Sequence, residues 1–197
     1  MSKLHISMNY CFRVFILSMF PLSAYAHVGS ESLMGLADGF MHPFMGIDHL
    51  LVMLAIGLWA SVLGGYRLWL LPLVFLSAMF IGAMLSFNGF VINGMEVWVA
   101  FSVLAVGLVL RQNKEVSAVV ACSLISVFAM AHGYVHAQEI GNGLSAEAYA
   151  VGFLMATAIL HLIGISARLF GLVTLKKIKN MYGLICALTG MAILVGS

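Results

Sequence analysis

The stretch M-H-P-F-M-G-I-D-H-L-L-V-M, residues 41–53, places two histidines and an aspartate inside a strongly apolar chain. His42 and His49 are seven residues apart, about two helical turns, so on one continuous helix they would share a face. Asp48 lies beside that face. Proline is tolerated in a first helical turn, so one interpretation is that a helix starts at Pro43 with His42 at its mouth. Ionisable groups are costly at membrane depth, and the cluster therefore indicates a functional site.

The composition is that of an integral membrane protein. Of 197 residues, 63% are hydrophobic and 8% are charged, whereas a soluble domain carries about 25% charged residues. We expect an all-α, polytopic fold with six transmembrane helices after a cleaved signal peptide. A mass of 21.2 kDa allows about six spans of ~20 residues with short loops, and no sizeable soluble domain. The net charge of +2 is too small to indicate nucleic acid as a partner.

Residues 1–26 have the features of a secretory signal peptide, which would leave residues 27–197 as the transmembrane domain. A basic start precedes a short apolar core at 14–22, and A-Y-A at 24–26 is a cleavage signal of the A-x-A type. An uncleaved first span is the alternative. Cleavage would make His27 the first residue, and its free α-amino group and imidazole would form a small metal chelate.

The mature chain divides into six apolar runs joined by short turns, and an amphipathic segment at 31–41 leads into the first run. The expected spans cover residues 46–63, 68–87, 95–110, 116–136, 146–169 and 180–195.

The basic residues of the mature chain lie at the ends of the first, third and fifth spans or in the turns that follow them, so all of them fall on one side of the membrane. They are Arg67, Arg111, Lys114, Arg168, Lys176, Lys177 and Lys179, whereas the turns at 88–94 and 137–145 contain no Lys or Arg. By the positive-inside rule the basic side is cytoplasmic. We therefore expect a multi-pass protein of a bacterial cytoplasmic (inner) membrane, surrounded by lipid, with its mature N-terminus and its C-terminus in the periplasm.

A second group of metal-competent residues lies in A-H-G-Y-V-H-A-Q-E, residues 131–139. His132 and His136 are one helical turn apart and Glu139 follows three residues later, so the three side chains would line one helix face. Two histidines at this spacing suit two ligands to one cation, as in other helical His-x-x-x-His sites.

Two further candidates stand alone: His161 in the fifth span and Glu96 at the outer mouth of the third. The topology brings all these groups toward one cavity open to the periplasm. A lone histidine could instead be a hydrogen-bonded packing residue, and Glu96 and Glu139 could be interfacial residues that face water. Imidazole with carboxylate suits Zn, Ni, Cu(II), Fe and Co, and the pattern does not choose among them.

Residues 42–49, H-P-F-M-G-I-D-H, have the form H-P-x-x-G-x-D-H and resemble the signature of the HupE/UreJ family of bacterial nickel and cobalt permeases. The family's second element resembles residues 131–139, where Tyr134 stands at a position that could hold another histidine, and its leader resembles Ala26-His27. The resemblance covers essentially the whole chain. It implies secondary uptake of Ni²⁺, or of Co²⁺, that supplies hydrogenase or urease maturation proteins. The resemblance implies that the metal path includes His42, Asp48, His49, His132, His136 and Glu139.

We therefore predict a secondary transporter for a divalent transition metal, and not an enzyme. In the expected mechanism the ion loses water to Glu96, Glu139 and the histidines, and then binds Asp48 with His42 and His49. Neutral imidazole is the ligand form, so metal entry can displace protons. The chain contains no G-x-x-x-x-G-K-[ST] motif, so the driving force would be the membrane potential or proton exchange.

The metal ion is cargo in this interpretation, no prosthetic group is expected, and a homo-oligomer is compatible with the sequence. The principal alternative is an intramembrane metal-dependent hydrolase, in which the same histidines would hold zinc and a nucleophilic water beside an activating carboxylate. A membrane metal sensor or accessory protein is a third interpretation.

Overall fold

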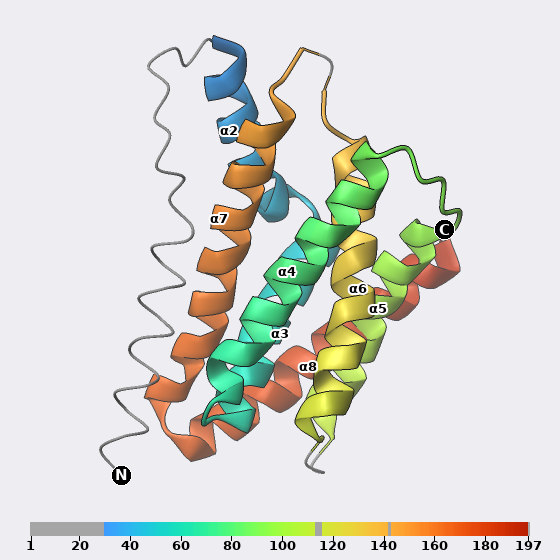
Figure 1. Ribbon diagram of the computed structural model, residues 1–197. Coiled ribbons are helices and arrows are strands. Elements are labelled where there is room, and N and C mark those ends of the chain that lie inside the picture. The colour runs from blue at the N-terminus through green and yellow to red at the C-terminus, as the bar shows by residue number, and fades with distance from the viewer. Residues whose placement is uncertain (1–29, 113–115, 142, 197) are drawn as a thin grey trace. The chain divides into compact units, whose positions relative to one another are not determined.

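The computed structural model describes residues 30–112, 116–141 and 143–196, and every regular element within these ranges is helical. Figure 1 shows the helices in chain order: α2 (Ser30–Met45), α3 (Ile47–Leu63), α4 (Arg67–Phe87), α5 (Met95–Arg111), α6 (Ala118–Gln138), α7 (Ala146–Ser166), the short 3₁₀ helix η1 (Ala167–Phe170) and α8 (Leu172–Gly196). The expected signal peptide, His27 and Lys114 lie outside the described residues.

Helices α3 to α8 occupy the six apolar runs recognised in the sequence. The largest difference is in the last run, because α8 begins at Leu172 and not near residue 180. The three lysines that indicated a turn, Lys176, Lys177 and Lys179, lie in the first turns of this helix. Lys179 is buried, and its Nζ donates a hydrogen bond of 2.8 Å to the carbonyl oxygen of Gln112, just beyond the end of α5.

Four helical segments are each long and apolar enough to cross a bilayer: α4, α6, α7 continued by η1, and α8. The bent pair of α2 and α3 brings the number to five if the two form one broken span. With 17 residues, α5 is about 25 Å long at 1.5 Å per residue, slightly less than the ~30 Å hydrocarbon core. The described helices therefore support four or five spans directly.

The break between α2 and α3 falls at Gly46, where the two helices form an angle of 81°. Helix α2 continues through Pro43 to Met45, and the extended backbone of Gly46, with φ −85° and ψ 120°, interrupts it. The interpretation that a helix starts at Pro43 and carries both histidines on one face is therefore wrong. His42 belongs to α2 and His49 to α3.

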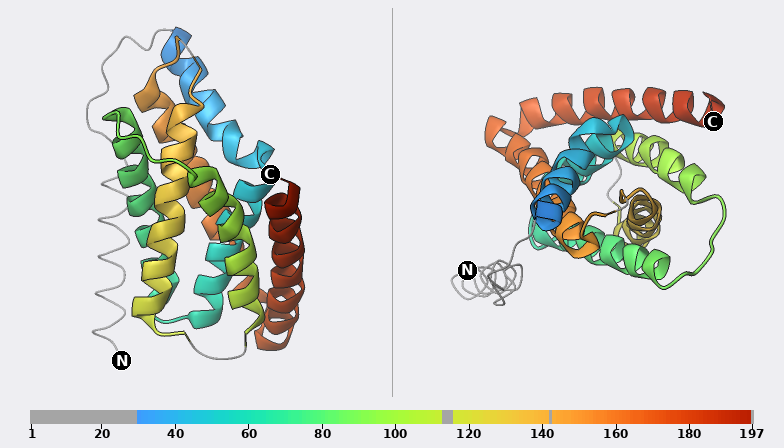
Figure 2. Two further views of the ribbon diagram at one scale, coloured as in Figure 1. Left: turned by 90° about the vertical axis from the view of Figure 1, so that its right-hand side faces the viewer. Right: turned by 90° about the horizontal axis from the view of Figure 1, so that it is seen from above.

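Close helix pairs make up the bundle. Helix α4 packs along α6, α5 along α8 and α3 along α7, and α8 runs along one side of the bundle when it is seen from above (Figure 2). Glycines permit this proximity: a Cβ atom on Gly57 of α3 would collide with the backbone of His161 on α7, and one on Gly164 would collide with the backbone of Leu54. Small residues at such contacts are typical of helix association in lipid.

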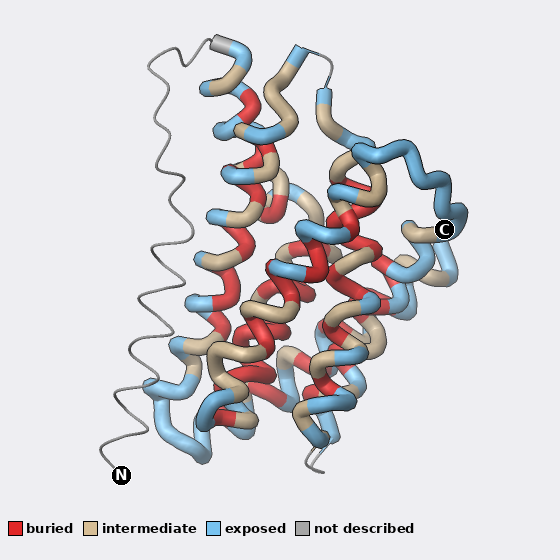
Figure 3. Tube along the Cα trace, in the orientation of Figure 1, coloured by how far each residue is buried: buried red, intermediate tan, exposed pale blue. Residues whose placement is uncertain are grey.

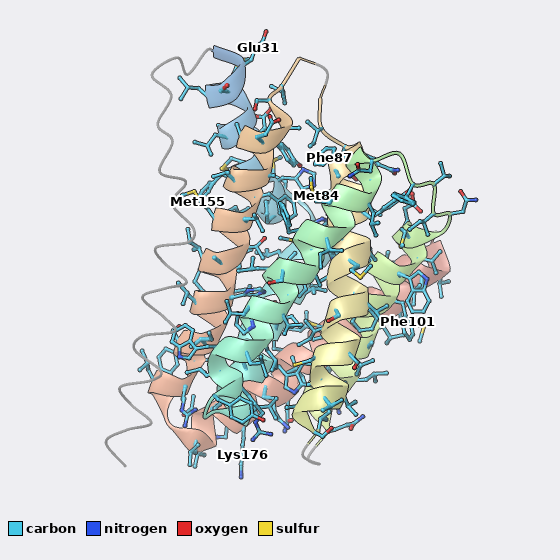
Figure 4. All side chains as sticks on the ribbon, viewed as in Figure 1. Glu31, Met84, Phe87, Phe101, Met155 and Lys176 are labelled. Atoms are coloured by element: carbon cyan, nitrogen blue, oxygen red, sulfur yellow. The ribbon has the colours of Figure 1, made fainter. Side chains whose placement is uncertain are left out.

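Large apolar side chains also cover the exterior of the bundle. Buried positions follow the inward faces of the helices (Figure 3), while Phe80, Phe101, Met155 and Leu162 are exposed. Met155 and Phe101 point away from the bundle on opposite sides in Figure 4. Large apolar side chains are stable on such a surface when lipid surrounds it. The chain is therefore a membrane protein.

The two ends of the bundle differ in charge. The links from α3 to α4 and from α7 to α8 lie at one end, which carries Arg67, Arg168 and Lys176, whereas Glu31 lies at the opposite end (Figures 1 and 4). The turns after α4 and α6 also lie at that opposite end and contain no described Lys or Arg.

Candidate metal site

Three histidines from three helices meet at the bend between α2 and α3. His42 of α2, His49 of α3 and His136 of α6 each offer a ring nitrogen, and the three nitrogens lie within 4.8 Å of one another. His49 and His136 are buried, with 3% and 4% of their surface exposed, while His42 is partly exposed. The chain bends by 81° between α2 and α3, and the rings of His42 and His49 lie 5.4 Å apart across this bend without sharing a helix.

Two carboxylates fix the orientation of the buried rings. Nδ1 of His49 lies 2.6 Å from Oδ1 of Asp48, which also accepts the backbone N–H of His49 at 2.9 Å. Nδ1 of His136 lies 2.6 Å from Oε2 of Glu139, and the same oxygen is 3.1 Å from Nε2 of His42. Hydrogen bonds from His136 and His42 hold the pKa of the Glu139 carboxyl well below its usual range, so this group is ionised.

These bonds determine which nitrogen of each ring remains available. An ionised carboxylate can only accept hydrogen bonds, so Nδ1 of His136 carries the proton, and Nδ1 of His49 carries it when Asp48 is ionised. In neutral imidazole the lone pair is then on Nε2. The two Nε2 atoms are in direct contact with each other. Two lone pairs that face one point repel each other, and a cation between them removes the repulsion.

The glycine of the motif is required by the same geometry. A Cβ atom on Gly46 would lie 2.7 Å from Nδ1 of His49 and 2.9 Å from Oδ1 of Asp48. Both atoms are engaged in the bond that orients the ring, so neither is the free end of a flexible side chain. Gly46 therefore has two roles: it interrupts the helix, and it leaves room for the Asp48–His49 pair.

Aromatic residues of α7, which sequence reasoning missed, border the cluster. The ring of Phe153 stacks on His136 with centroids 5.5 Å apart and an interplanar angle of 21°, and it also lies 5.7 Å from His42. The Tyr149 ring is 5.9 Å from His42. These residues form an i, i+4 aromatic pair on the helix, and Gly152 between them lets α2 approach α7 closely. The aromatic spacing was the available signal, but it is common in apolar spans.

The other predicted site residues lie at different levels. His132 is fully buried one turn deeper on α6; its Nδ1 donates a 2.9 Å hydrogen bond to the Phe128 carbonyl, and its ring is 5.4 Å from His49. His161 is buried deep in α7, and no described residue makes a hydrogen bond with either ring nitrogen. The described residues therefore supply no hydrogen bond of the kind that the packing alternative for His161 expected. Glu96 is exposed in the first turn of α5 and is not part of the three-histidine group.

Comparison with known proteins agrees with the motif at 42–49. A family model described as HupE / UreJ protein matches residues 15–193. The chain belongs to the HupE/UreJ family. Protein HupE of Rhizobium leguminosarum bv. viciae is 37% identical over 182 residues, which cover 89% of this chain and 92% of that protein. No solved structure matches the chain.

The HupE/UreJ resemblance noted at H-P-x-x-G-x-D-H and at residues 131–139 is thus confirmed. Within the second element, Tyr134 does not join the histidines. Its hydroxyl donates a 2.7 Å hydrogen bond to the Phe90 carbonyl and accepts one of 2.9 Å from the N–H of Ile92. Tyr134 therefore anchors the turn after α4 to α6.

Proposed function

We propose that this HupE/UreJ protein carries a divalent transition-metal ion, Ni²⁺ first and Co²⁺ second, inward across the cytoplasmic membrane. The observation that carries the proposal is the convergence of the Nε2 lone pairs of His49 and His136, with a ring nitrogen of His42 within 4.8 Å. Imidazole nitrogen is a preferred ligand of Ni, Co and Zn. The chain belongs to the HupE/UreJ family. Its resemblance to that family implied a nickel or cobalt permease.

The charges around the three rings match a divalent ion. Asp48 and Glu139 together contribute two negative charges when ionised, and the three histidines are neutral when they act as ligands. Each carboxylate bonds to Nδ1 of a ring whose Nε2 faces the cluster. In metal sites such partners fix the tautomer and raise the basicity of the ring. We therefore assign Asp48 and Glu139 to orienting the ligands, and His42, His49 and His136 to binding the ion.

These groups suit transport of a metal ion better than they suit hydrolysis. A zinc hydrolase needs a carboxylate free to activate the metal-bound water, whereas both carboxylates here are engaged by histidine ring nitrogens. The half-exposed Glu139 and the partly exposed His42 suit an outer entrance where an ion exchanges water for protein ligands. The membrane potential favours inward movement of a divalent cation.

In this proposal the chain crosses the membrane six times, and the short α5 is the third crossing. The histidine cluster lies near the periplasmic end of the bundle. The basic links from α3 to α4 and from α7 to α8 are then cytoplasmic, as the positive-inside rule requires. Periplasmic termini, a cleaved leader and supply of hydrogenase or urease maturation proteins belong to the same proposal.

Uptake of radioactive nickel tests this function. Cells or proteoliposomes with the protein should accumulate nickel faster than empty controls, and excess Co²⁺ should compete more strongly than Mg²⁺. His49→Ala protein at equal membrane abundance is the matched control and should behave as the empty membrane does. Accumulation that does not depend on the protein, or on His49, would contradict the transport proposal.

A further inference from the structure

Beyond the outer cluster, the bundle interior contains polar atoms that no hydrogen bond explains. Within the described ranges, Nε2 of His132, Oγ1 of Thr157 and both ring nitrogens of His161 are buried without a hydrogen-bond partner. Leaving one buried polar atom unpaired costs about 1–3 kcal/mol. Such costs are expected where the groups have a ligand to bind, and the outer three-histidine site does not include these atoms.

The unpaired atoms follow two helices inward from the outer cluster. On α7, Phe153 contacts the outer rings, Thr157 lies one turn further, and His161 lies two turns further. Eight residues correspond to about 12 Å along a helix. Helix α3 gives the same depth, because Gly57, which packs against the backbone of His161, follows His49 by eight residues.

Two more side chains connect these levels. His132 precedes His136 by one turn on α6, a step of about 6 Å toward the inner end. The ring of Phe75 on α4 is near both deeper histidines, with its centroid 6.1 Å from His132 and 5.1 Å from His161. Phe75 is completely buried. Phe75 therefore connects the level of His132 with the level of His161 through ring contacts.

We propose that His161 and Thr157, with Nε2 of His132 at the upper edge, form a second, inner binding station for the same divalent transition-metal ion. The inference rests on the proposed transport function. His161 differs from His132 in having neither ring nitrogen engaged, so its ring can present whichever nitrogen the ion approaches. Thr157 lies one turn from His161 on the same face and adds a neutral oxygen. A site with fewer imidazoles than the outer three-histidine cluster binds the ion more weakly, which permits onward release.

A shape-conserving substitution separates this role from packing. His161→Phe retains a ring of similar size and removes both unpaired nitrogens, so a packing role predicts normal uptake and equal or greater stability. The inner station predicts that the maximal nickel uptake rate of His161→Phe falls at least about tenfold, while its apparent KM and the nickel affinity of the purified protein stay within about twofold. Thr157→Val, which removes only the hydroxyl, should show the same pattern to a smaller extent.

A direct probe of metal at this position uses the purified full chain with Co²⁺ alone. His161→Cys should give a cobalt–thiolate charge-transfer band that the wild-type protein, which already contains Cys122 and Cys186, does not give. If His161→Phe takes up nickel at the wild-type rate, the inner station is overturned. It is also overturned if folded His161→Cys gives no cobalt–thiolate band. Either result leaves the transport proposal intact. Absence of wild-type nickel uptake would instead contradict the transport function, and the cobalt band would still decide whether the inner position binds metal.

Discussion

Replacing Gly46 with alanine places a methyl carbon 2.7 Å from Nδ1 of His49 and 2.9 Å from Oδ1 of Asp48. Ordinary van der Waals contact begins at 3.4 Å, so the His49 ring must move by about 0.7 Å, the difference between 3.4 and 2.7 Å. The backbone of Gly46, at φ −85° and ψ 120°, is in a region that alanine adopts without strain. The predicted defect therefore comes from the ring and not from the fold.

The size of the defect follows from the hydrogen bond that the methyl group displaces. The 2.6 Å contact between His49 and Asp48 is charge-assisted, and such a bond contributes about 1.5–3 kcal/mol. At 1.4 kcal/mol per factor of ten, its loss weakens metal binding by about tenfold to a hundredfold. Equilibrium binding of radioactive nickel to purified Gly46→Ala protein measures this, and uptake at limiting nickel should fall in proportion.

Gly141 supplies the matched control for this experiment. A Cβ atom at Gly141 would meet Leu144 at 3.4 Å, an ordinary contact, in a turn at the same end of the bundle. Gly141→Ala should therefore bind nickel normally. In a His49→Ala background, Gly46→Ala should have no further effect, because the ring it displaces is absent. Normal nickel affinity in Gly46→Ala would refute the reasoning. So would a loss of affinity on adding Gly46→Ala to His49→Ala that equals the loss caused by Gly46→Ala alone.

Four further outcomes follow from the site and the topology. Asp48→Asn should weaken nickel binding by about tenfold to a hundredfold at normal membrane abundance, because the charge that orients His49 is lost. Glu139→Gln should weaken it at least as much, since one oxygen serves two rings. In intact cells, an impermeant thiol reagent should label a cysteine at Asn88 and not one at Lys177. If the mature chain begins at His27, then His27→Ala should slow uptake at limiting nickel and leave the saturated rate unchanged.

Each of these outcomes has a control and a contrary result. Glu147 lies at the same end of the bundle, is exposed and bonds with Ser145, so Glu147→Gln should transport normally. Wild-type nickel affinity in Asp48→Asn or Glu139→Gln would show that the carboxylates do not orient the ligands. Labelling at Lys177 but not at Asn88 would reverse the topology. N-terminal sequencing that starts elsewhere than His27 would remove the capture role of that residue.

Much of the helical layout could be predicted from hydrophobic periodicity, because apolar runs long enough to cross a bilayer form helices wherever they occur. The start of α8 could not. Its lysines resembled a turn by charge alone, but Lys179 is buried and bonds with Gln112, which extends the helix toward the end of α5. Charge indicates which end of a helix faces the basic side, and not where the helix begins.

The candidate site was predictable in its residue types and not in its geometry. Histidines in two motifs indicated convergence, and His42, His49 and His136 do converge. The sequence does not predict the bend at Gly46, because the close approach of the Asp48–His49 pair to the glycine exists only in the folded chain. Sequence spacing cannot show such a contact, and spacing alone therefore predicts His42 and His49 on one helix.

The depth of His161 depends on contacts between distant parts of the chain. The register of α7 and the packing of Gly57 against the backbone of His161 together place His161 about 12 Å below His49 along the helices. The histidines that the topology is expected to bring to one cavity lie at an outer level and at a deeper level. The roles of Asp48 and Glu139 likewise follow from their hydrogen bonds and not from their residue types.

X-ray absorption at the nickel edge of the purified, nickel-loaded protein tests the central claim most directly. Ligation by His42, His49 and His136 predicts the multiple-scattering pattern of three imidazoles in the wild-type protein and of two in His136→Ala, with the Glu139→Gln spectrum retaining the nitrogen ligands at lower occupancy. A spectrum of oxygen ligands alone, or one that does not change when His136 is removed, would contradict a metal site at this bend.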